Sequence, residues 1–571
     1  MSILKTALAW VAQDPDDETR AFLEQLISDA QQSSDTADSK AAAQQAILEL
    51  SQRFSSRLAF GTAGLRAELG AGSNRMNRVV VSQTASGIAR WLKKTEAEGP
   101  VVIGYDGRKN SDVFARDSAE ILSGAGLKVV LLPRKLPTPV LAFAVQYFGA
   151  SAGIMVTASH NPPNDNGYKV YLGSEAGGGQ IVPPIDEDIA RKIDKAARED
   201  IREYPRAEDY YIADEDVVDA YVAATAKLVE AQAAPLNWVY TAMHGVGWRT
   251  TKTLLEVTGF DAPVTVDEQL FPDPLFSTVA FPNPEEPGAL DLAFAAADKH
   301  GAELIIAHDP DADRLGVAIP SGNPSPKSPE DAYRRLSGNE VGMILGWEIA
   351  KRRAASTESS KQPGTMAVSL VSSPALSRVA AKFGLDYVET PTGFKWIVQT
   401  PNLVFGYEEA LGYLVQPNVV SDKDGISASL LLLDIAAKLK VAGKTLADNL
   451  EDFAAEFGYF ASDQVSFRFD DVSEIARIMA RLRTTPLTEI GGSAVVNAED
   501  LLLVLDDAQP ADILRYQLED GSRIIARPSG TEPKLKVYLD VSADEGSYAE
   551  KVAAARVRLD ELAASIRELF A

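Results

Sequence analysis

A strand, turn, helix and strand pattern recurs three times along the chain and constrains the fold more than any other feature. Each copy runs from an apolar stretch through a polar loop into a helical stretch that ends at a glycine, and a second apolar stretch follows. The copies occupy residues 101–132, 237–266 and 365–390, with Gly126, Gly259 and Gly384 at the helix ends. Glycine readily adopts the left-handed backbone that often follows a helix. The pattern predicts three similar α/β domains with mixed sheets, although unrelated βαβ units would also produce it.

The remaining sequence divides around these units. A chain of 571 residues is expected to form three or four domains of about 100–200 residues each. Residues 1–57 are amphipathic and predict helices with Asp16 or Asp17 as a cap, and the Pro/Ser-rich residues 320–337 look like a linker. Near the C-terminus, a hairpin and one long helix predict an α+β domain. We therefore expect four domains, at residues 1–210 (with the helical extension), 211–322, 323–455 and 456–571.

The charge balance and the absence of cysteine narrow the possible functions. The chain has 56 Lys and Arg against 81 Asp and Glu, a net charge of −25. This argues against nucleic acid and anionic membranes as partners, because both require a dense basic surface. Without cysteine, thiol catalysis, disulfides and cysteine-based zinc sites are excluded. No segment approaches the roughly 18 apolar residues of a membrane span and no signal peptide is recognisable, so we expect a cytoplasmic protein.

A serine follows an apolar strand in the segment GIMVTASHNPPNDNGYKVY, residues 153–171. Ser159 stands in a turn with Asn161 and Pro162, where its hydroxyl could be a nucleophile. The segment lacks the G-x-S-x-G pattern of hydrolases, and with four histidines in the chain a Ser-His-Asp triad has few candidate bases. The alternative is a turn serine that bonds only to nearby backbone.

Three aspartates follow the apolar strand of ELIIAHDPDADRLGVAI, residues 303–319. In extended chain, the spacing of Asp309, Asp311 and Asp313 places their carboxylates on one side. Such close anions repel unless a cation lies among them, and a set of oxygen ligands suits Mg²⁺. An EF-hand would need Gly and Glu where Arg314 and Pro320 stand. The pattern predicts a Mg²⁺ site in which Arg314 holds the carboxylates or reaches a phosphate, with a solvated acidic turn as the alternative.

Two glycine-rich loops concentrate cations, as an anionic substrate of an acidic protein would require. The segment IIARPSGTEPKLKVY, residues 524–538, combines a guanidinium, hydroxyls and a glycine whose neighbouring N–H groups can converge on an anion. It predicts a phosphate site, with a polar β-turn as the alternative, formed by Arg527, Ser529, Gly530, Thr531 and Lys534. The loop at residues 60–77, which contains Arg66, is a weaker second candidate.

The third domain carries two further polar segments after strands. Lys395 lies in ETPTGFKWI, residues 389–397, and Glu408 and Glu409 lie in VFGYEEALGYLV, residues 404–415. A carboxylate at the end of a strand can accept two sugar hydroxyls. An exposed acidic helix start is the alternative.

Taken together and in this order, the segments resemble the α-D-phosphohexomutase family over roughly residues 55–540. The resemblance rests on TASHNP, DPDADR, GYEEALGY and RPSGTEP. It implies three α/β domains and a distinct fourth domain, heart-shaped around a central cleft. It also implies that Ser159 is phosphorylated and that Mg²⁺ lies between it and the three aspartates. The residues that it implies in substrate binding are Glu408, Arg527, Ser529, Gly530 and Thr531. From the residues alone we add Arg66, Arg314 and Lys534 to the candidate substrate-binding residues.

The activity implied by this resemblance is that of a phosphosugar mutase with a sugar bisphosphate intermediate. A base must take the proton of the sugar hydroxyl; Lys169 is our first candidate, Lys395 the second and His160 the third. A lysine base needs a lowered pKa, which we expect neighbouring cations to supply.

The substrate is expected to be a sugar phosphate. With Ala410 and Tyr413, the segment GYEEALGY resembles that of the phosphoglucomutase and phosphopentomutase branch of the family. We therefore favour glucose 1-phosphate and glucose 6-phosphate as substrates, with glucose 1,6-bisphosphate as intermediate and activator. Mannose or pentose phosphates are the runner-up substrates. A phosphatase and a non-catalytic sugar-phosphate sensor are alternatives of other classes. We expect a monomer or dimer.

Overall fold

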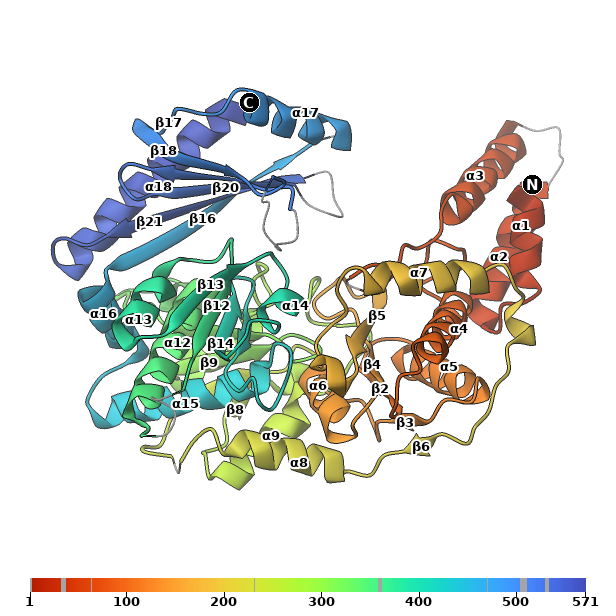
Figure 1. Ribbon diagram of the computed structural model, residues 1–571, viewed down its shortest axis with the longest axis horizontal. Coiled ribbons are helices and arrows are strands. Elements are labelled where there is room, and N and C mark those ends of the chain that lie inside the picture. The colour runs from red at the N-terminus through yellow and green to blue at the C-terminus, as the bar shows by residue number, and fades with distance from the viewer. Residues whose placement is uncertain are drawn as a thin grey trace. The chain divides into compact units, whose positions relative to one another are not determined.

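The computed structural model describes residues 3–31, 37–62, 64–230, 232–357, 362–469, 471–503, 511–528 and 534–570 (Figure 1). The chain forms two compact units. Unit 1 comprises Met1–Arg335 and Gly412–Asp434, and unit 2 comprises Leu336–Leu411 and Ile435–Ala571. Over the described ranges, no helix combines the length and the apolar character that crossing a membrane requires.

Three helices open unit 1 and confirm the helical prediction for the N-terminal residues. They are α1 (Ile3–Val11), α2 (Asp17–Gln31) and α3 (Ala37–Phe54). Asp16 caps α2, because its Oδ1 accepts hydrogen bonds from the backbone N–H groups of Glu18 at 2.9 Å and Thr19 at 3.3 Å. Trp10 of α1 meets Phe54 of α3 edge to face, with 5.5 Å between the ring centroids. Aromatic packing thus joins the first helix to the third.

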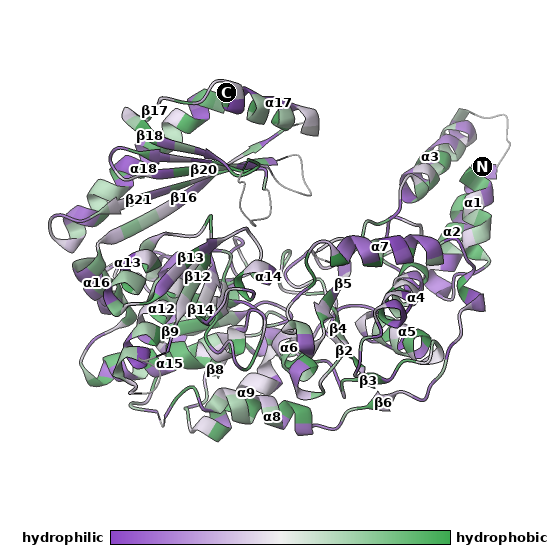
Figure 2. Ribbon diagram, in the orientation of Figure 1, coloured by the Kyte–Doolittle hydropathy of each residue, from purple (hydrophilic) through white to green (hydrophobic). Residues whose placement is uncertain are grey.

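Six strands form the first sheet of unit 1 in the order β1-β5-β4-β2-β3-β6. β2 is parallel to β3 and β4, and β3 is parallel to β6, whereas β5 is antiparallel to β4 and β1. The strands are β1 (Leu65–Glu68), β2 (Val101–Tyr105), β3 (Val129–Leu131), β4 (Ala152–Val156), β5 (Asp165–Leu172) and β6 (Tyr211–Ile212). The helices are α4 (Arg78–Thr95), α5 (Ser111–Gly124), α6 (Thr138–Tyr147) and α7 (Ile185–Ala196). Figure 2 shows that α7 is mostly hydrophilic, so only one side of it packs inward, through Ile189, Ile193 and Ala196.

The second sheet of unit 1 has the order β11-β10-β9-β7-β8. Its strands are β7 (Trp238–Thr241), β8 (Val264–Thr265), β9 (Leu304–His308), β10 (Leu315–Pro320) and β11 (Tyr333–Arg335), and its helices are α8 (Asp216–Ala226), α9 (Gly247–Thr258), α10 (Asp291–His300) and α11 (Pro329–Ala332). β11 lies inside the stretch that we interpreted as a linker. It joins the sheet because the Tyr333 ring is buried and its hydroxyl donates to Ala302 O at 2.8 Å. The linker interpretation was therefore wrong for the second part of that stretch, where β11 forms.

Unit 2 contains the third and fourth sheets. In the third, β12 (Thr365–Ser369) lies between β13 (Asp386–Thr390) and β14 (Leu403–Glu408), parallel to both. Its helices are α12 (Gly338–Ala355), α13 (Ala375–Phe383) and α14 (Phe394–Ile397). The fourth sheet has the order β16-β21-β20-β19-β18-β17 and is antiparallel throughout. Its elements are β16 (Tyr459–Arg468), α17 (Val472–Thr484), β17 (Glu489–Ile490), β18 (Ser493–Asp500), β19 (Leu514–Leu518), β20 (Arg523–Pro528), β21 (Lys534–Ala543) and α18 (Tyr548–Phe570), preceded by α16 (Leu446–Phe457). Along the chain, β15 (Gly412–Leu414) and α15 (Gly425–Val441) follow β14.

The three βαβ units are present as the sequence pattern predicts. β2 and β3, β7 and β8, and β12 and β13 form parallel pairs joined by α5, α9 and α13. Gly126, Gly259 and Gly384 follow these helices with φ of 83°, 72° and 65°. The left-handed conformation that the pattern requires of glycine is therefore observed three times, and the prediction of three α/β domains with a distinct C-terminal α+β domain is confirmed.

Candidate active site

Ser159 lies in a tight turn directly after β4. Its φ of +49° is left-handed, a conformation that costs a non-glycine residue roughly 1–3 kcal/mol and is found preferentially at functional sites. The Thr157 hydroxyl fixes the turn by accepting the backbone N–H of Ser159 at 2.8 Å. The buried Ser159 hydroxyl donates to Asp309 Oδ2 at 2.7 Å, a partner 150 residues away. Ser159 is therefore more than a turn serine with only local hydrogen bonds.

A buried arginine that the sequence analysis missed holds this turn. Arg108 follows β2, and its guanidinium donates to the carbonyls of Ser159 and Asn161 at 2.6 Å, Pro162 at 2.8 Å and Asp165 at 2.9 Å. The Asp106 carboxylate lies 3.7 Å from its Nε. Four carbonyls converge on one cation, so the turn can keep its strained conformation.

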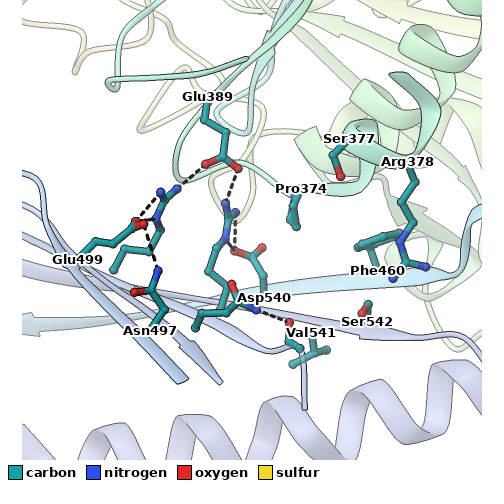
Figure 3. Close-up of a pocket in the computed structure, with 14 residues that line it drawn as sticks. Pro374, Ser377, Arg378, Glu389, Phe460, Asn497, Glu499, Asp540, Val541 and Ser542 are labelled. Carbon is teal, nitrogen blue, oxygen red and sulfur yellow. Dashed lines mark hydrogen bonds and ion pairs between the residues drawn. The ribbon is translucent and has the colours of Figure 1, made fainter. Parts of the chain in front are cut away.

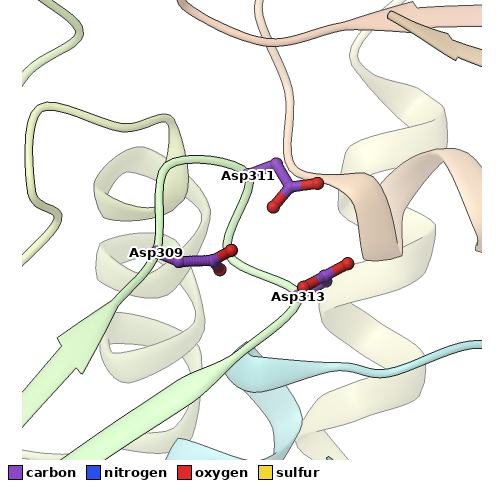
Figure 4. A group of neighbouring side chains, drawn as sticks. All are labelled: Asp309, Asp311 and Asp313. Atoms are coloured by element: carbon purple, nitrogen blue, oxygen red, sulfur yellow. The ribbon is translucent and has the colours of Figure 1, made fainter. Parts of the chain in front are cut away.

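The three aspartates converge as predicted, but a turn brings them together rather than the alternation of an extended chain. They lie in the turn between β9 and β10, where Ala312 has a φ of +54°, so the chain curls rather than alternating in extended form. Carboxylate oxygens of Asp309, Asp311 and Asp313 lie within 4.8 Å of one another and all three side chains are buried (Figure 4). Because they are buried, the alternative of a solvated acidic turn fails.

Two lysines neutralise part of this negative charge. Lys169 on β5 places its Nζ 2.8 Å from Asp311 Oδ2 and 2.7 Å from Asp313 Oδ2, and Lys423 Nζ lies 3.4 Å from Asp313 Oδ2. Burial raises the pKa of Asp311 and of Asp313, but Lys169 lowers both, with Thr138 at Asp311 and with Lys423 and Arg314 at Asp313, so both pKa values lie below their ordinary range. Burial and the two neighbouring carboxylates raise the pKa of Asp309 well above its ordinary value.

The donor set fits a hard divalent cation. Oδ1 of Asp311 and Oδ1 of Asp313 are buried without a hydrogen-bond partner, an arrangement that costs free energy unless something satisfies them. The candidate ligands are carboxylate oxygens with a serine hydroxyl beside them, and no sulfur is present. Oxygen ligands of this kind suit Mg²⁺.

The predicted bases differ in protonation. Burial lowers the pKa of Lys169, but Asp311 and Asp313 outweigh burial, so that its pKa is raised rather than lowered as we expected. Lys423 and Arg66 lower its pKa, as we expected of neighbouring cations, but their effect is weaker than that of these carboxylates. Burial, together with Arg314 and Arg66, lowers the pKa of His160 well below its ordinary value. The neutral ring lies with Nδ1 3.2 Å from Ser159 Oγ.

The remaining predicted residues of unit 1 lie around the same turns. Arg66 is on β1, opposite Gly167 of the β5 strand that carries Lys169. Arg314 follows the aspartates; its backbone N–H donates to Asp309 Oδ1 at 3.1 Å and its Nε lies 3.9 Å from Asp313 Oδ1. Unit 1 thus brings Ser159, His160, Lys169 and the three aspartates together with these two arginines.

The other predicted residues lie in unit 2. Lys395 is on α14, Glu408 ends β14 and is buried, Arg527 is on β20, and Lys534 begins β21. Ser529, Gly530 and Thr531 lie outside the described residues. Glu409, which the sequence analysis grouped with Glu408, has a supporting role, because its Oε2 accepts from the hydroxyls of Ser369 at 2.9 Å and Ser372 at 3.0 Å.

A buried ion-pair network joins the third and fourth sheets inside unit 2 and was also missed from the sequence (Figure 3). Arg523, at the start of the strand that carries Arg527, donates to Asp540 Oδ2 at 2.8 Å, to Glu389 Oε1 at 2.9 Å and to the carbonyl of Ser372. Glu389 also pairs with Arg515. One buried guanidinium therefore links β20 to the ends of two elements of the third sheet.

Comparison with known proteins agrees with this architecture. Family profiles described as phosphoglucomutase/phosphomannomutase alpha/beta/alpha domains I, II and III match residues 57–200, 219–322 and 337–457, and the profile of the C-terminal domain of that family matches residues 469–559. The match covers all four domains in order and most of the chain.

Individual relatives match this chain over most of its length and of their own. A Haemophilus influenzae protein named "Probable phosphomannomutase" is 54% identical over 479 residues, which is 84% of this chain and 96% of that protein. The human phosphopentomutase is 34% identical over 572 residues, covering 91% of this chain and 90% of its own. The crystal structure of parafusin, a phosphoglucomutase from Paramecium, has the same fold with a TM-score of 0.69 at 19% identity, covering 90% of this chain and 95% of that chain.

Proposed function

This chain belongs to the phosphoglucomutase/phosphomannomutase family, and from that premise we propose that it transfers a phosphoryl group between two hydroxyls of one sugar through Ser159. The observation that carries the proposal is the 2.7 Å contact between Ser159 Oγ, held in a strained turn, and Asp309 of the carboxylate cluster. A phosphoryl group transferred at this hydroxyl needs positive charge beside it, and a divalent cation held by these carboxylates would supply that charge.

The metal would be held by Asp309, Asp311 and Asp313, beside Ser159 Oγ. Mg²⁺ bound there supplies positive charge that offsets the negative charge of the transferring phosphoryl oxygens. Lys169 and Lys423 already lie at these carboxylates, and Arg314 lies beside them, so the cations of an otherwise acidic protein are concentrated at this point.

The proton transfers follow from the protonation of the side chains. When the phosphoserine gives up its phosphoryl group, the P–O bond to Ser159 breaks and a bond to the sugar oxygen forms. The sugar hydroxyl gives its proton to Lys169 in its neutral form, and the departing Ser159 Oγ takes a proton from the protonated His160 ring. In the reverse step Ser159 Oγ loses its own proton to the neutral His160 ring 3.2 Å away, and the raised pKa of Lys169 suits it to give a proton to the departing sugar oxygen. Lys395 of unit 2 is the second candidate for that exchange.

The choice of sugar is the second part of this proposal. We favour glucose 1-phosphate and glucose 6-phosphate, with glucose 1,6-bisphosphate as intermediate and activator, held by Glu408 at the sugar and by Arg66, Arg527 and the residues around it at the phosphate. Mannose and pentose phosphates are the second candidates, because relatives over most of the chain are named for phosphomannomutase and phosphopentomutase activity. A coupled assay of glucose, mannose and ribose 1-phosphates with Mg²⁺ and sugar bisphosphate ranks them, and a kcat/KM highest for mannose or ribose would contradict the glucose assignment.

The nucleophile is tested on the purified protein. Mass spectrometry should find phosphate on the peptide that contains Ser159, and Ser159→Ala should abolish turnover while circular dichroism and thermal unfolding stay unchanged. Ser174→Ala, in the loop after β5, is the matched control and should be fully active. Turnover by Ser159→Ala, or release of free phosphate from glucose 1-phosphate by the wild type, would refute a serine-based mutase.

A further inference from the structure

A cavity in unit 1 lies outside the candidate active site and has an unusual lining. Its volume is about 270 Å³, and of its nine lining residues three are cationic and none is acidic. The whole chain has 81 acidic residues against 56 basic ones, so a cavity with only positive charge runs against the composition. The lining comes from the loop before α6, the first turn of α9 and the loop after β8.

The three cations differ in how they are held. Arg134 forms two hydrogen bonds with Glu215, at 2.8 and 3.1 Å, so its guanidinium is fixed in place. Lys135 and Arg249 are exposed, and among the described residues no carboxylate lies within 4.0 Å of either. Two positive charges are thus available at the rim to an anion such as a phosphate.

The rest of the lining is apolar and partly aromatic. Trp248 is half-buried and rests on Tyr240, with 5.2 Å between the ring centroids, so its position is fixed by packing. Phe271 leaves 57% of its surface exposed. A fixed aromatic surface beside cations favours a ligand that carries both a flat ring and an anionic group.

One residue that lines this cavity, Val246, and one residue just beyond its lining, Thr138, are hydrogen-bonded to the aspartate turn. The backbone N–H of Val246 donates to Pro310 O at 2.9 Å. Thr138 follows Lys135 by three residues; its N–H donates to Asp311 O at 2.9 Å and its hydroxyl to Asp311 Oδ2 at 2.6 Å. A ligand that draws these two segments together would therefore move the hydrogen-bond donors that hold the turn of Asp309, Asp311 and Asp313.

We propose that this cavity is an effector site for a nucleoside monophosphate, whose phosphate binds Lys135 and Arg249 and whose base lies against Trp248 and Phe271. The volume lies just below the roughly 300 Å³ at which small-molecule pockets begin, which favours a mononucleotide over larger nucleotides. The ligand acts on the rate of the mutase through Val246 and Thr138, which hold the turn of Asp309, Asp311 and Asp313.

Binding is tested by calorimetry with AMP, and with adenosine and inorganic phosphate as its two parts. Glucose 1,6-bisphosphate is added in excess so that AMP does not report on the candidate active site. One AMP should bind per chain, more tightly than either part, and added salt should weaken it. Lys135→Ala/Arg249→Ala should weaken AMP binding by roughly tenfold or more, since each loses a charge-assisted contact with phosphate. Lys93→Ala, an exposed lysine of α4 away from the cavity, is the matched control and should bind AMP as the wild type does.

Absence of AMP binding, equal binding of phosphate alone, or wild-type binding by the double variant would overturn the site. These outcomes are independent of turnover, so they are separable from failure of the proposed mutase activity. The coupling is tested by kcat with saturating AMP. The double variant should keep the basal kcat and lose the response to AMP, whereas a wild-type kcat that AMP leaves unchanged would overturn the regulatory role.

Discussion

Arg108→Ala is the substitution for which the structure predicts the largest combined loss of stability and activity. The guanidinium is almost completely buried and donates to four carbonyls of the turn that contains Ser159. It also stacks over the ring of Phe276 at 5.0 Å. Its removal leaves these carbonyls unsatisfied and leaves the carboxylate of Asp106 buried without its cation. Burial raises the pKa of Asp106, and Arg108 opposes this effect more strongly than any of the hydrogen bonds to the carboxylate.

The size of the effect follows from these contacts. Breaking a buried ion pair by removing one partner costs about 3–5 kcal/mol. The unsatisfied carbonyls would add about 1–3 kcal/mol each if they stayed dry, but water can enter the space that the side chain leaves. We therefore expect the free energy of the first unfolding transition in urea to fall by about 3–5 kcal/mol. Release of the strained Ser159 turn should lower kcat by about a hundredfold, as a displacement near 1 Å does.

The assay combines urea unfolding, read by circular dichroism, with mutase kinetics on the same preparations. Arg191→Ala is the control, since this arginine is 62% exposed and forms only surface ion pairs. It should change stability by less than about 0.5 kcal/mol and leave kcat unchanged. If Arg108→Ala lost less than about 1 kcal/mol, or kept the wild-type kcat, the reasoning that Arg108 holds the Ser159 turn would be wrong.

Three further predictions concern unit 2 and the response to acid. Arg527→Ala should raise KM and lower kcat together, because the proposed contact with the substrate phosphate would be lost, and an unchanged kcat/KM would remove Arg527 from the proposed site. Arg523→Met should lower the free energy of unfolding by about 3–5 kcal/mol by leaving Asp540 buried without its cation, whereas the more exposed Arg515→Ala should cost less than about 1 kcal/mol; equal losses in urea unfolding would contradict this assignment. Burial lowers the pKa of His244 below its ordinary value of 6.5, so the folded state holds the ring neutral and stability is lost as the pH falls below 6.5, where the unfolded chain takes up the proton. His244→Gln should flatten this dependence of the melting temperature between about pH 7 and about pH 5, and an identical slope would show that another group titrates.

Features that depend on neighbouring residues were predictable from the sequence. Gly126, Gly259 and Gly384 follow helices because the left-handed conformation is a local property of the backbone, and Asp16 caps α2 for an equally local reason. The three aspartates were found because they are adjacent in sequence, although their convergence results from a turn at Ala312 rather than from extended chain.

Features that depend on distant partners were not predictable. Arg108 and Ser159 are 51 residues apart and Arg523 and Glu389 are 134 apart, and nothing near either arginine distinguishes it from the surface arginines of this chain. The protonation of Lys169 was predicted with the wrong sign for the same reason. Its pKa depends on which charges burial places beside it, and these come from a turn more than 140 residues away.

Neighbouring residues were enough to set which local structures form and which chemical groups are available. These are the βαβ units, the capped helices, a serine and three aspartates after strands, and loops rich in glycine and cations. Folding then brings Ser159 to Asp309 and Lys169 to Asp311 and Asp313, and it buries the supporting arginines. The physical reason is that backbone conformation responds to adjacent residues, whereas burial and electrostatic fields sum over all atoms that folding brings near, wherever they stand in the chain.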